Sequence, residues 1–182
     1  LGWSLAGNAL EDGVWSLQTL NIRSFAGHND HIVDDAPFGG GAGMVMRPDV
    51  IDRALECVTK SLEEASVPIL YLTPRGIPLT QAKVKELSAG NGIILVCGRY
   101  EGIDERAIEA WKMEEISLGD YILSGGEPGA ISLIDACVRL LPGVMGSGQS
   151  QEEESFEKGL LEYPHYTRPR SWRDREVPDV LL

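Results

Sequence analysis

Short apolar runs along the chain have the length and composition of buried β-strands. The second and third runs do not alternate between polar and apolar residues, a pattern typical of parallel strands that are covered on both faces. The runs that predict strands are VWSLQTLNI (14–22), VPILYL (67–72), GIILVC (92–97) and EEISL (114–118).

Helix signals occupy the stretches between these runs. Pro48 stands near the first turn of one predicted helix, and the apolar residues after it are spaced to form one face. Thr80 is a suitable N-cap for the next helix, which is predicted to end at Gly90. The alternation of strand and helix predicts an α/β layer fold in which loops at the carboxyl ends of parallel strands bind ligands. The predicted helices cover residues 47–65, 80–90, 104–111 and 128–141.

The last part of the chain, residues 143–182, loses this pattern. It is rich in Gly, Ser, Glu, Pro and Arg, which predicts an extended arm or linker rather than a core element. The whole chain has 16 Lys and Arg against 28 Asp and Glu, a net charge of −12 that by itself argues against binding nucleic acid. A local basic tract can still dock a phosphate on an acidic body. The arginines of this tract are Arg168, Arg170, Arg173 and Arg175.

Composition narrows the class of protein further. With 182 residues, the chain can form one well-buried domain plus a tail. It has neither an apolar run of roughly 18 residues nor a signal peptide, so we expect a cytoplasmic protein that does not interact with a membrane. Cys57, Cys97 and Cys137 are far apart and lie in apolar runs, which predicts buried, reduced thiols rather than a metal site or a disulfide framework.

Two glycine-hinged segments follow predicted strands. In CGRYEG (97–102), successive backbone N–H groups could meet acceptor atoms of a ligand, although a plain strand-to-helix turn capped by Asp104 fits the same spacing. Glu101 lies between two hinge glycines, where we expect no packing role for its side chain. Its carboxylate would suit a ligand amine, a sulfonium or the edge of a base. SLGDYILSGG (117–126) offers an apolar wall with free amides, which suits an adenine ring, or else it is a loop with a structural Gly-Gly pair.

A third glycine-rich segment, VDDAPFGGGAGMVM (33–46), is too flexible for a strand or helix interior. It lacks the Lys-Ser/Thr pair of a P-loop and the preceding strand of a dinucleotide fold, which argues against ATP and NAD as ligands. A surface loop is the simpler interpretation. Near the other end, HYTRPRSWR (165–173) interleaves aromatic and cationic residues, as expected for contact with RNA or for a Pro-bound linker.

These motifs, together with YLTPRG (71–76) and SFEKGLLEYPHYTRP (155–169), closely resemble the bacterial tRNA (guanine-N1)-methyltransferases of the TrmD type, which are SPOUT methyltransferases. The resemblance covers nearly the whole chain. It implies an α/β, parallel-sheet SPOUT domain with a carboxy-terminal trefoil knot at residues 1–142, followed by an extended interdomain arm at 143–182. It also implies that the family's first strand and its carboxy-terminal tRNA-binding domain are missing from this chain.

The resemblance further implies that the three loops of the knot clasp S-adenosylmethionine. Glu162 stands where the family carries an aspartate near the amine of the methionine moiety. The cofactor-binding residues implied in this way are Tyr71, Leu72, Thr73, Pro74, Gly98, Arg99, Tyr100, Glu101, Gly102, Ser117, Leu118, Gly119, Asp120, Tyr121, Ile122, Leu123, Gly125, Gly126 and Glu162.

The implied reaction methylates N1 of the guanosine at tRNA position 37, beside the anticodon. Neutral guanine carries a proton on N1, so a base must remove it while a cation supports the charge that moves toward O6. The resemblance implies these roles for Glu154, where the family carries an aspartate, and for Arg139, with Glu153 as an alternative base. Without the resemblance, the three glutamates at 152–154 would be a solvated surface and Arg139 a helix-end residue.

The resemblance also implies tRNA as a partner and a homodimer with shared active sites, in which each arm reaches over the pocket of the other subunit. Mg²⁺ is expected to act through carboxylates and RNA, without a tight protein site. A related knotted methyltransferase acting on another RNA, or a non-catalytic RNA-binding module, are the alternatives. The implied substrate-binding residues are Asp34, Asp35, Gly41, Gly43 and Arg168.

Overall fold

The structure of the chain is a computed structural model that describes residues 1–27, 31–62, 67–145 and 163–182. Contacts within the chain group it into two compact units, Leu1–Gly146 and Ser147–Leu182.

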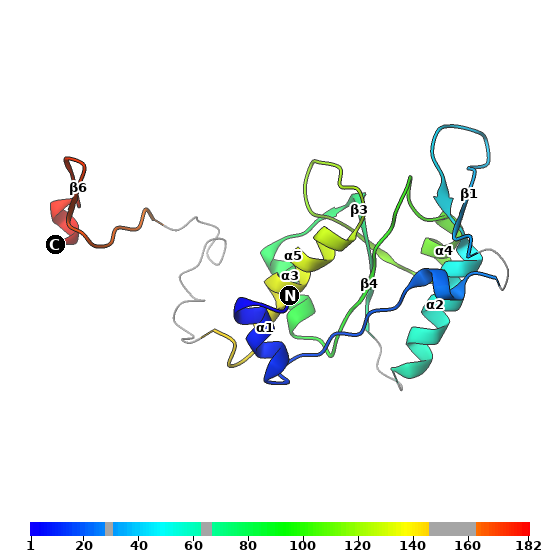
Figure 1. The fold of residues 1–182 in the computed structure, drawn as a ribbon, viewed down its shortest axis with the longest axis horizontal. Helices are drawn as coiled ribbons and strands as arrows, with labels where there is room; N and C mark the ends of the chain where they lie inside the picture. The colour runs from blue at the N-terminus through cyan, green and yellow to red at the C-terminus, as the bar shows by residue number, and fades with distance from the viewer. Residues whose placement is uncertain (28–30, 63–66, 146–162) are drawn as a thin grey trace. The chain divides into compact units, whose positions relative to one another are not determined.

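The first unit is built on a parallel sheet of three strands in the order β4-β3-β5. Each strand falls on one of the predicted apolar runs, so these three strand predictions and their parallel arrangement are confirmed. The fold is therefore of the mixed α/β class (Figure 1). The strands are β3 (Ile69–Pro78), β4 (Ile94–Val96) and β5 (Glu114–Ser117).

Helices cover both faces of this sheet. Helices α2 and α4 share one hydrophobic cluster with the sheet, and α3 and α5 share another on the opposite face (Figure 1). A shorter helix, α1, packs beside α5 through Ala6, Ala9 and Val138. The helices are α1 (Ser4–Glu11), α2 (Pro48–Ser61), α3 (Gln81–Ser88), α4 (Glu105–Ala110) and α5 (Glu127–Val138).

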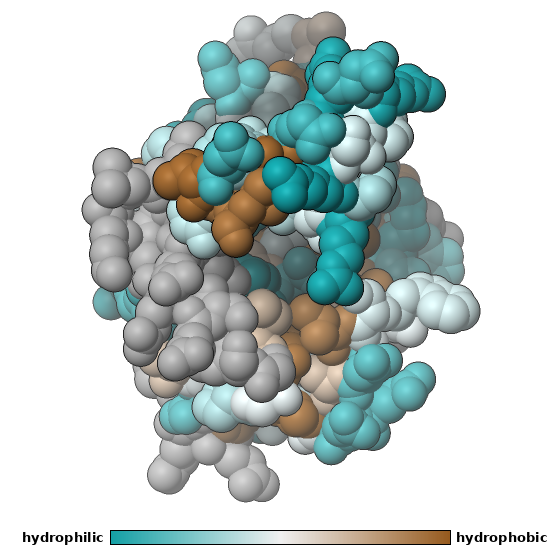
Figure 2. Space-filling model, turned by 90° about the vertical axis from the view of Figure 1, so that its left-hand side faces the viewer, coloured by the Kyte–Doolittle hydropathy of each residue, from teal (hydrophilic) through white to brown (hydrophobic). Residues whose placement is uncertain are grey.

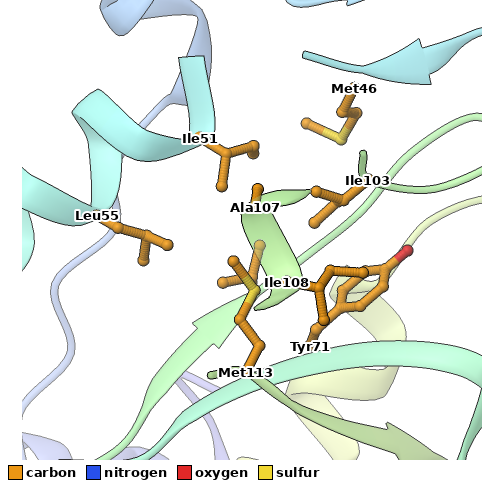
Figure 3. Packing of buried hydrophobic residues seen from close by; sticks show 9 residues of the cluster. Met46, Ile51, Leu55, Tyr71, Ile103, Ala107, Ile108 and Met113 are labelled. Carbon is orange, nitrogen blue, oxygen red and sulfur yellow. The ribbon is translucent and has the colours of Figure 1, made fainter. Parts of the chain in front are cut away.

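The middle strand, β3, is buried on both faces, which explains why its residues are apolar without alternation. Tyr71 points into the cluster formed with α2 and α4, which Figure 3 shows at close range. Its neighbours Leu70 and Leu72 point into the cluster formed with α3 and α5. Successive side chains of a strand face opposite sides, so a strand buried on both faces needs apolar residues at every position.

Two predicted helix caps are present. The side chain of Thr80 accepts a hydrogen bond from the backbone N–H of Lys83 at 3.3 Å. The side chain of Asp104 accepts one from the N–H of Arg106 at 3.0 Å. Such bonds satisfy N–H groups that the first turn of a helix leaves without a partner. Both helix starts are therefore confirmed.

Two predictions about the first unit are wrong. Residues 14–22 form no strand: 14–21 have no regular structure, and a 3₁₀ helix, η1 (Ile22–Phe25), begins at the end of the run. No described strand lies where it could supply backbone partners to this stretch, and Val14 and Leu17 are more than 40% exposed as a result. Cys57 is not buried either, because it lies on the outer side of α2.

The other two cysteines are half-buried (Cys97) and buried (Cys137), and all three are free thiols. Burial raises the pKa of the Cys137 thiol to about 11, and it also raises the pKa of the Cys97 thiol. Both groups are therefore protonated at neutral pH, which makes them poor nucleophiles.

The glycine-rich segment forms a hairpin whose two short strands, β1 (Asp34–Asp35) and β2 (Val45–Met46), pair antiparallel. The intervening loop projects from the first unit beside α2 (Figure 1). A parallel bridge between Met46 and Ile103 joins the hairpin to the segment that follows β4.

The second unit contains a small antiparallel hairpin of β6 (Ser171–Trp172) and β7 (Arg175–Glu176), followed by a 3₁₀ turn, η2 (Asp179–Leu181). Part of the basic tract thus forms a hairpin, whereas the sequence predicted only an extended arm.

On the face shown in Figure 2, brown hydrophobic side chains reach the surface between teal hydrophilic ones. In the part of the chain that the structure describes, none of the helices has the length and apolar character needed to cross a bilayer.

Candidate functional site

The first wall of the site is the segment 73–76, where β3 kinks. β3 pairs with β5 before this kink and again after it, since both Leu72 and Ile77 lie opposite Ile116. The extra residues bulge out of the ladder and place Thr73 and Pro74 at the carboxyl end of β5. Gly76 lies directly against the backbone of Glu115 and Ile116, with no room for a Cβ atom. Only glycine allows two main chains to approach this closely.

The second wall is the segment 98–102, which folds over the ring of Tyr71. An added Cβ would lie 2.8 Å from the Tyr71 ring at Gly98 and 2.9 Å from the Tyr71 hydroxyl at Gly102. Tyr100 adopts a left-handed φ of 58°, which non-glycine residues rarely take and which indicates a fixed, tight bend. Burial raises the pKa of Tyr71, so its hydroxyl is neutral at physiological pH.

The third wall is the segment 117–126, between β5 and α5. The N–H of Gly126 donates a hydrogen bond of 3.0 Å to the carbonyl oxygen of Gly98, and a Cβ at Gly126 would lie 2.8 Å from the Cα of Cys97. Ser117 donates through its hydroxyl to the carbonyl oxygen of Gly119 at 3.1 Å. The second and third walls are thus in direct backbone contact.

The three walls enclose one pocket at the carboxyl ends of the strands. Of the residues predicted to bind a cofactor, all but Asp120 and Glu162 line it; Asp120 is exposed beside it, and Glu162 lies outside the described residues. Three lining residues were missed: Ile116, Ser124 and Gly129. Ile116 and Gly129 carry no polar group that would mark them in a sequence, and their placement follows from the kink in β3 and the start of α5. The lining residues are Tyr71–Pro74, Gly98–Gly102, Ile116–Gly119, Tyr121–Gly126 and Gly129.

Ion pairs fasten the walls to one another. The guanidinium of Arg99 donates to one carboxylate oxygen of Glu127 through Nη2 at 2.7 Å and Nε at 3.1 Å, and it reaches the carbonyl oxygen of Ser124 at 3.4 Å. Arg75 bridges Glu105 and Glu115, each at 3.0 Å. These side chains are about half-exposed, so each pair stabilises the fold only modestly, and its main effect is to fix where the loops lie.

The glycine-rich hairpin lies at the mouth of this pocket. The N–H of Glu101 donates to the carbonyl oxygen of Met44 at 3.0 Å, and the N–H of Met46 donates to that of Gly102 at 2.9 Å. The Glu101 side chain packs against Gly43, where a Cβ would overlap it. The expectation that Glu101 has no packing role is therefore wrong: its Cγ methylene and carboxyl group fill the space that Gly43 leaves.

The predicted substrate residues separate into two groups. Asp34, Asp35, Gly41 and Gly43 all belong to the hairpin that contacts segment 98–102, and Gly41 has a φ of 123° with open space around its Cα. Arg168 is exposed and belongs to the second unit.

The predicted catalytic residues are placed only in part. Arg139 follows the last residue of α5 and is half-buried; helix α5 ends at Val138, earlier than the sequence predicted. Glu153 and Glu154 lie outside the described residues. Among the residues of the described ranges, no group of three His, Cys, Asp or Glu side chains could hold a metal ion.

The pocket matches the chemistry of S-adenosylmethionine on three counts. Leu72 and Leu118 give it an apolar wall of the kind that an adenine ring requires. Glycines recur in its loops, so main-chain amides and carbonyls make up part of its wall. The carboxylate of Glu101 lies at its rim and could meet a sulfonium or an amine. Fold and site together define an α/β protein with a glycine-rich pocket at the carboxyl ends of its parallel strands.

Comparisons with known proteins specify the family. The family model described as "tRNA (Guanine-1)-methyltransferase TrmD" matches residues 1–182. The chain is 59% identical to a protein of Rhizorhabdus wittichii over 181 residues, covering 100% of this chain and 73% of the relative. It is 57% identical to one of Zymomonas mobilis, with 72% of that relative covered, and 59% identical to one of Rhodospirillum rubrum, with 74% covered. Each of these relatives is named tRNA (guanine-N(1)-)-methyltransferase.

The chain therefore belongs to the TrmD family of tRNA (guanine-1)-methyltransferases. The resemblance drawn from the glycine-hinged motifs is confirmed.

Proposed function

We propose that this protein is an S-adenosylmethionine-dependent enzyme that methylates N1 of the guanosine at position 37 of tRNA. The observation that carries the proposal is the meeting of the three glycine-hinged walls around one pocket in a chain of this family. The names of the relatives support the tRNA substrate and the N1 atom. S-adenosylmethionine, when bound, supplies an electrophilic methyl group.

The pocket residues bind and orient this donor. Backbone amides and carbonyls of segment 117–126 would hold the edge of the adenine, and Leu72 and Leu118 would supply the apolar wall for its ring. The Arg99–Glu127 pair keeps the second and third walls at a fixed separation. Because the binding groups belong to the main chain and are already held in place, little ordering is needed when the ligand arrives.

The chemistry at guanine needs a base and a cation from this chain. Glu154 takes the proton from N1 as the N1–methyl bond forms and the bond from the methyl group to the sulfonium sulfur breaks, which leaves a neutral thioether. Arg139 stabilises the charge that develops on O6. Arg139 follows the last residue of α5, whereas the first residues of that helix close the third wall of the pocket. The helix, about 18 Å long, separates this cation from the pocket of its own subunit, so we place Arg139 at the shared site of the homodimer. A planar, permanently charged guanidinium suits an oxygen that gains charge.

The division of labour along the chain follows from this assignment. Residues 1–142 form a SPOUT domain with a trefoil knot, and residues 143–182 form an arm that brings Glu154 and Arg168 to the substrate. The close crossings at Gly76 and Gly126 support the knot, since both put one segment of main chain directly against another. The enzyme acts in the cytoplasm as a homodimer with shared active sites, and Mg²⁺ assists through carboxylates and RNA.

Methylation of tRNA transcripts tests the proposal. The wild-type protein is expected to transfer methyl groups to a transcript with G at position 37 and not to one with A there. Glu154→Gln removes the base at nearly constant shape, so we expect kcat to fall about 100-fold or more while the affinity for S-adenosylmethionine stays unchanged. Glu153→Gln is the matched control and should keep near wild-type activity.

Three outcomes would contradict parts of the proposal. A fully active Glu154→Gln with an inactive Glu153→Gln moves the base to Glu153. Equal methylation of both transcripts points to a knotted methyltransferase with another RNA target. A wild-type protein that releases no heat on titration with S-adenosylmethionine is an RNA-binding module rather than an enzyme.

A further inference from the structure

Phe38 is the most exposed large hydrophobic residue in the described part of the chain. Its side chain is 99% exposed and belongs to the loop between β1 and β2, which projects from the first unit (Figure 1). No hydrophobic cluster of the protein includes it. An aromatic ring that is fully in water contributes nothing to folding, so the fold gives no reason for this residue.

The backbone of the loop holds Phe38 at the corner of a turn. The N–H of Gly40 donates to the carbonyl oxygen of Pro37 at 3.2 Å, and Gly39 has a φ of 88°. A four-residue turn with positive φ at its third residue is of type II, and it displays the side chain of its second residue outward. In the described part of the chain, no atom lies within 4 Å of the position that a Cβ would take at Gly39, Gly40 or Gly41. The loop beside the Phe38 ring is therefore open to solvent.

This turn stands next to the cofactor pocket. The end of the loop bonds to segment 98–102 through Met44 and packs Gly43 against Glu101, and both Glu101 and Gly102 line the pocket. The hairpin borders the side of the pocket formed by Glu101 and Gly102, so the nucleotide beside a base held in the pocket can reach the hairpin.

The charge of the hairpin selects what can approach Phe38. Asp34 and Asp35 form β1, and Glu101 lies against the other end of the loop. Three carboxylates repel a phosphate, whereas the amino and imino groups of a base can donate hydrogen bonds to them. The surface therefore favours the face and edge of a base over the sugar-phosphate backbone.

We propose that Phe38 stacks on the base of a tRNA nucleotide that flanks the target guanosine, and this rests on the proposed function. Methylation at N1 requires the Watson–Crick edge of guanine to reach the methyl donor, so the guanine must leave the stack of its neighbours. The neighbouring base then loses a stacking partner, and the ring of Phe38 replaces it. Phe38 is a positioning residue for the substrate and takes no part in the chemical step.

Substitutions at Phe38 distinguish stacking from simple hydrophobicity. Phe38→Leu keeps an apolar side chain but removes the π-face, and we expect it to weaken tRNA binding about tenfold or more, the usual loss for one base–aromatic stack. Phe38→Tyr and Phe38→Trp keep the stack and should bind tRNA within a few-fold of the wild type. All three should bind S-adenosylmethionine as the wild type does by calorimetry, which reports an intact pocket.

A fluorescent base gives a direct readout. With 2-aminopurine beside position 37 of the transcript, binding to the wild type should quench the fluorescence through stacking on the ring, and binding to Phe38→Leu at saturating protein should not. Equal quenching by both proteins, or equal tRNA affinity of Phe38→Leu and wild type, would overturn the inference. In that case an active wild type leaves the proposed methyltransferase function standing, whereas a wild type that methylates no tRNA contradicts the function itself.

Discussion

At the scale of single residues, this protein builds its pocket by leaving side chains out. Gly98 and Gly102 let a loop close over the ring of Tyr71, and Gly126 lets the start of α5 touch the backbone at Cys97. None of these positions tolerates a Cβ without a shift of its neighbour. Their spacing in the sequence predicted a ligand site because glycines recur after predicted strands.

Substituting one of these glycines should weaken the cofactor site. In Gly98→Ala, the new methyl group would lie 2.8 Å from the Tyr71 ring, so the loop must move. We expect the Kd for S-adenosylmethionine to rise about tenfold, equivalent to about 1.4 kcal/mol, as measured by calorimetry. Gly90→Ala is the matched control, because the nearest atom there is 3.4 Å away, and it should bind as the wild type does. Equal Kd values for the two variants would show that the pocket does not depend on Gly98.

The residues that sequence reasoning missed have an equally local cause. Ile116 and Gly129 line the pocket although neither has a polar group, and their place there depends on how the chain kinks at Thr73–Gly76 and restarts at Glu127. A pattern of apolar and polar positions carries no information about such a kink. The prediction that Glu101 has no packing role was wrong for a similar reason, because its contact with Gly43 joins segments far apart in sequence.

At the scale of helices and strands, the signals for helix starts were the most reliable part of the sequence. Thr80 and Asp104 cap the helices that they were predicted to cap. Three of the four apolar runs became strands, and the run at 14–22 did not. Strand propensity needs a neighbouring backbone before it becomes a strand, and in the described part of the chain this run has none beside it.

The N-cap of α4, Asp104, is expected to stabilise the fold to a degree that depends on pH. Asp104→Ala should lower the free energy of unfolding by about 1 kcal/mol at neutral pH, because the N–H of Arg106 loses its acceptor. Hydrogen bonds from Arg106 hold the pKa of Asp104 below 3.8 in the folded state. The carboxylate therefore stabilises the fold above its unfolded pKa, and this contribution is lost as pH falls through the lower folded pKa.

Urea unfolding at neutral pH and at acid pH measures this effect. The difference between wild type and Asp104→Ala should shrink at the acid end. Asp104→Asn keeps an oxygen acceptor without the charge, so it should be the less destabilised variant at neutral pH and should show little of the pH dependence. A constant difference across pH would mean that the charge of Asp104 does not contribute.

At the scale of the whole chain, charge and function were the hardest to reconcile. A net charge of −12 is unusual for a protein that handles RNA, and composition alone argued against such a substrate. The layer order of the sheet and its helices followed from the alternation of apolar runs and amphipathic stretches. The hairpin of the second unit did not, because its strands are only two residues long and lie exposed to solvent.

Arginines of the second unit give a test on the whole protein. Arg168→Gln should lower tRNA affinity and reduce the slope of log K against log salt concentration by about 1, as expected when one phosphate contact is lost. Arg170→Gln is the comparison, because its guanidinium lies 3.8 Å from Glu176 and 3.9 Å from Asp179 and is already partly neutralised. Filter binding at several salt concentrations measures both. Equal effects of the two variants would contradict a specific role for Arg168.

The glycines in the pocket wall have a consequence for inhibitors. A compound that takes part of its affinity from amides and carbonyls of segments 98–102 and 117–126 would meet main chain there, which a point mutation does not alter. Gly98, Gly102 and Gly126 are also closed to change, since a Cβ atom there would lie within 3 Å of Tyr71 or Cys97. Resistance would then have to arise by substitution of the remaining wall residues, such as Leu118 or Ile122, or through higher expression of the enzyme.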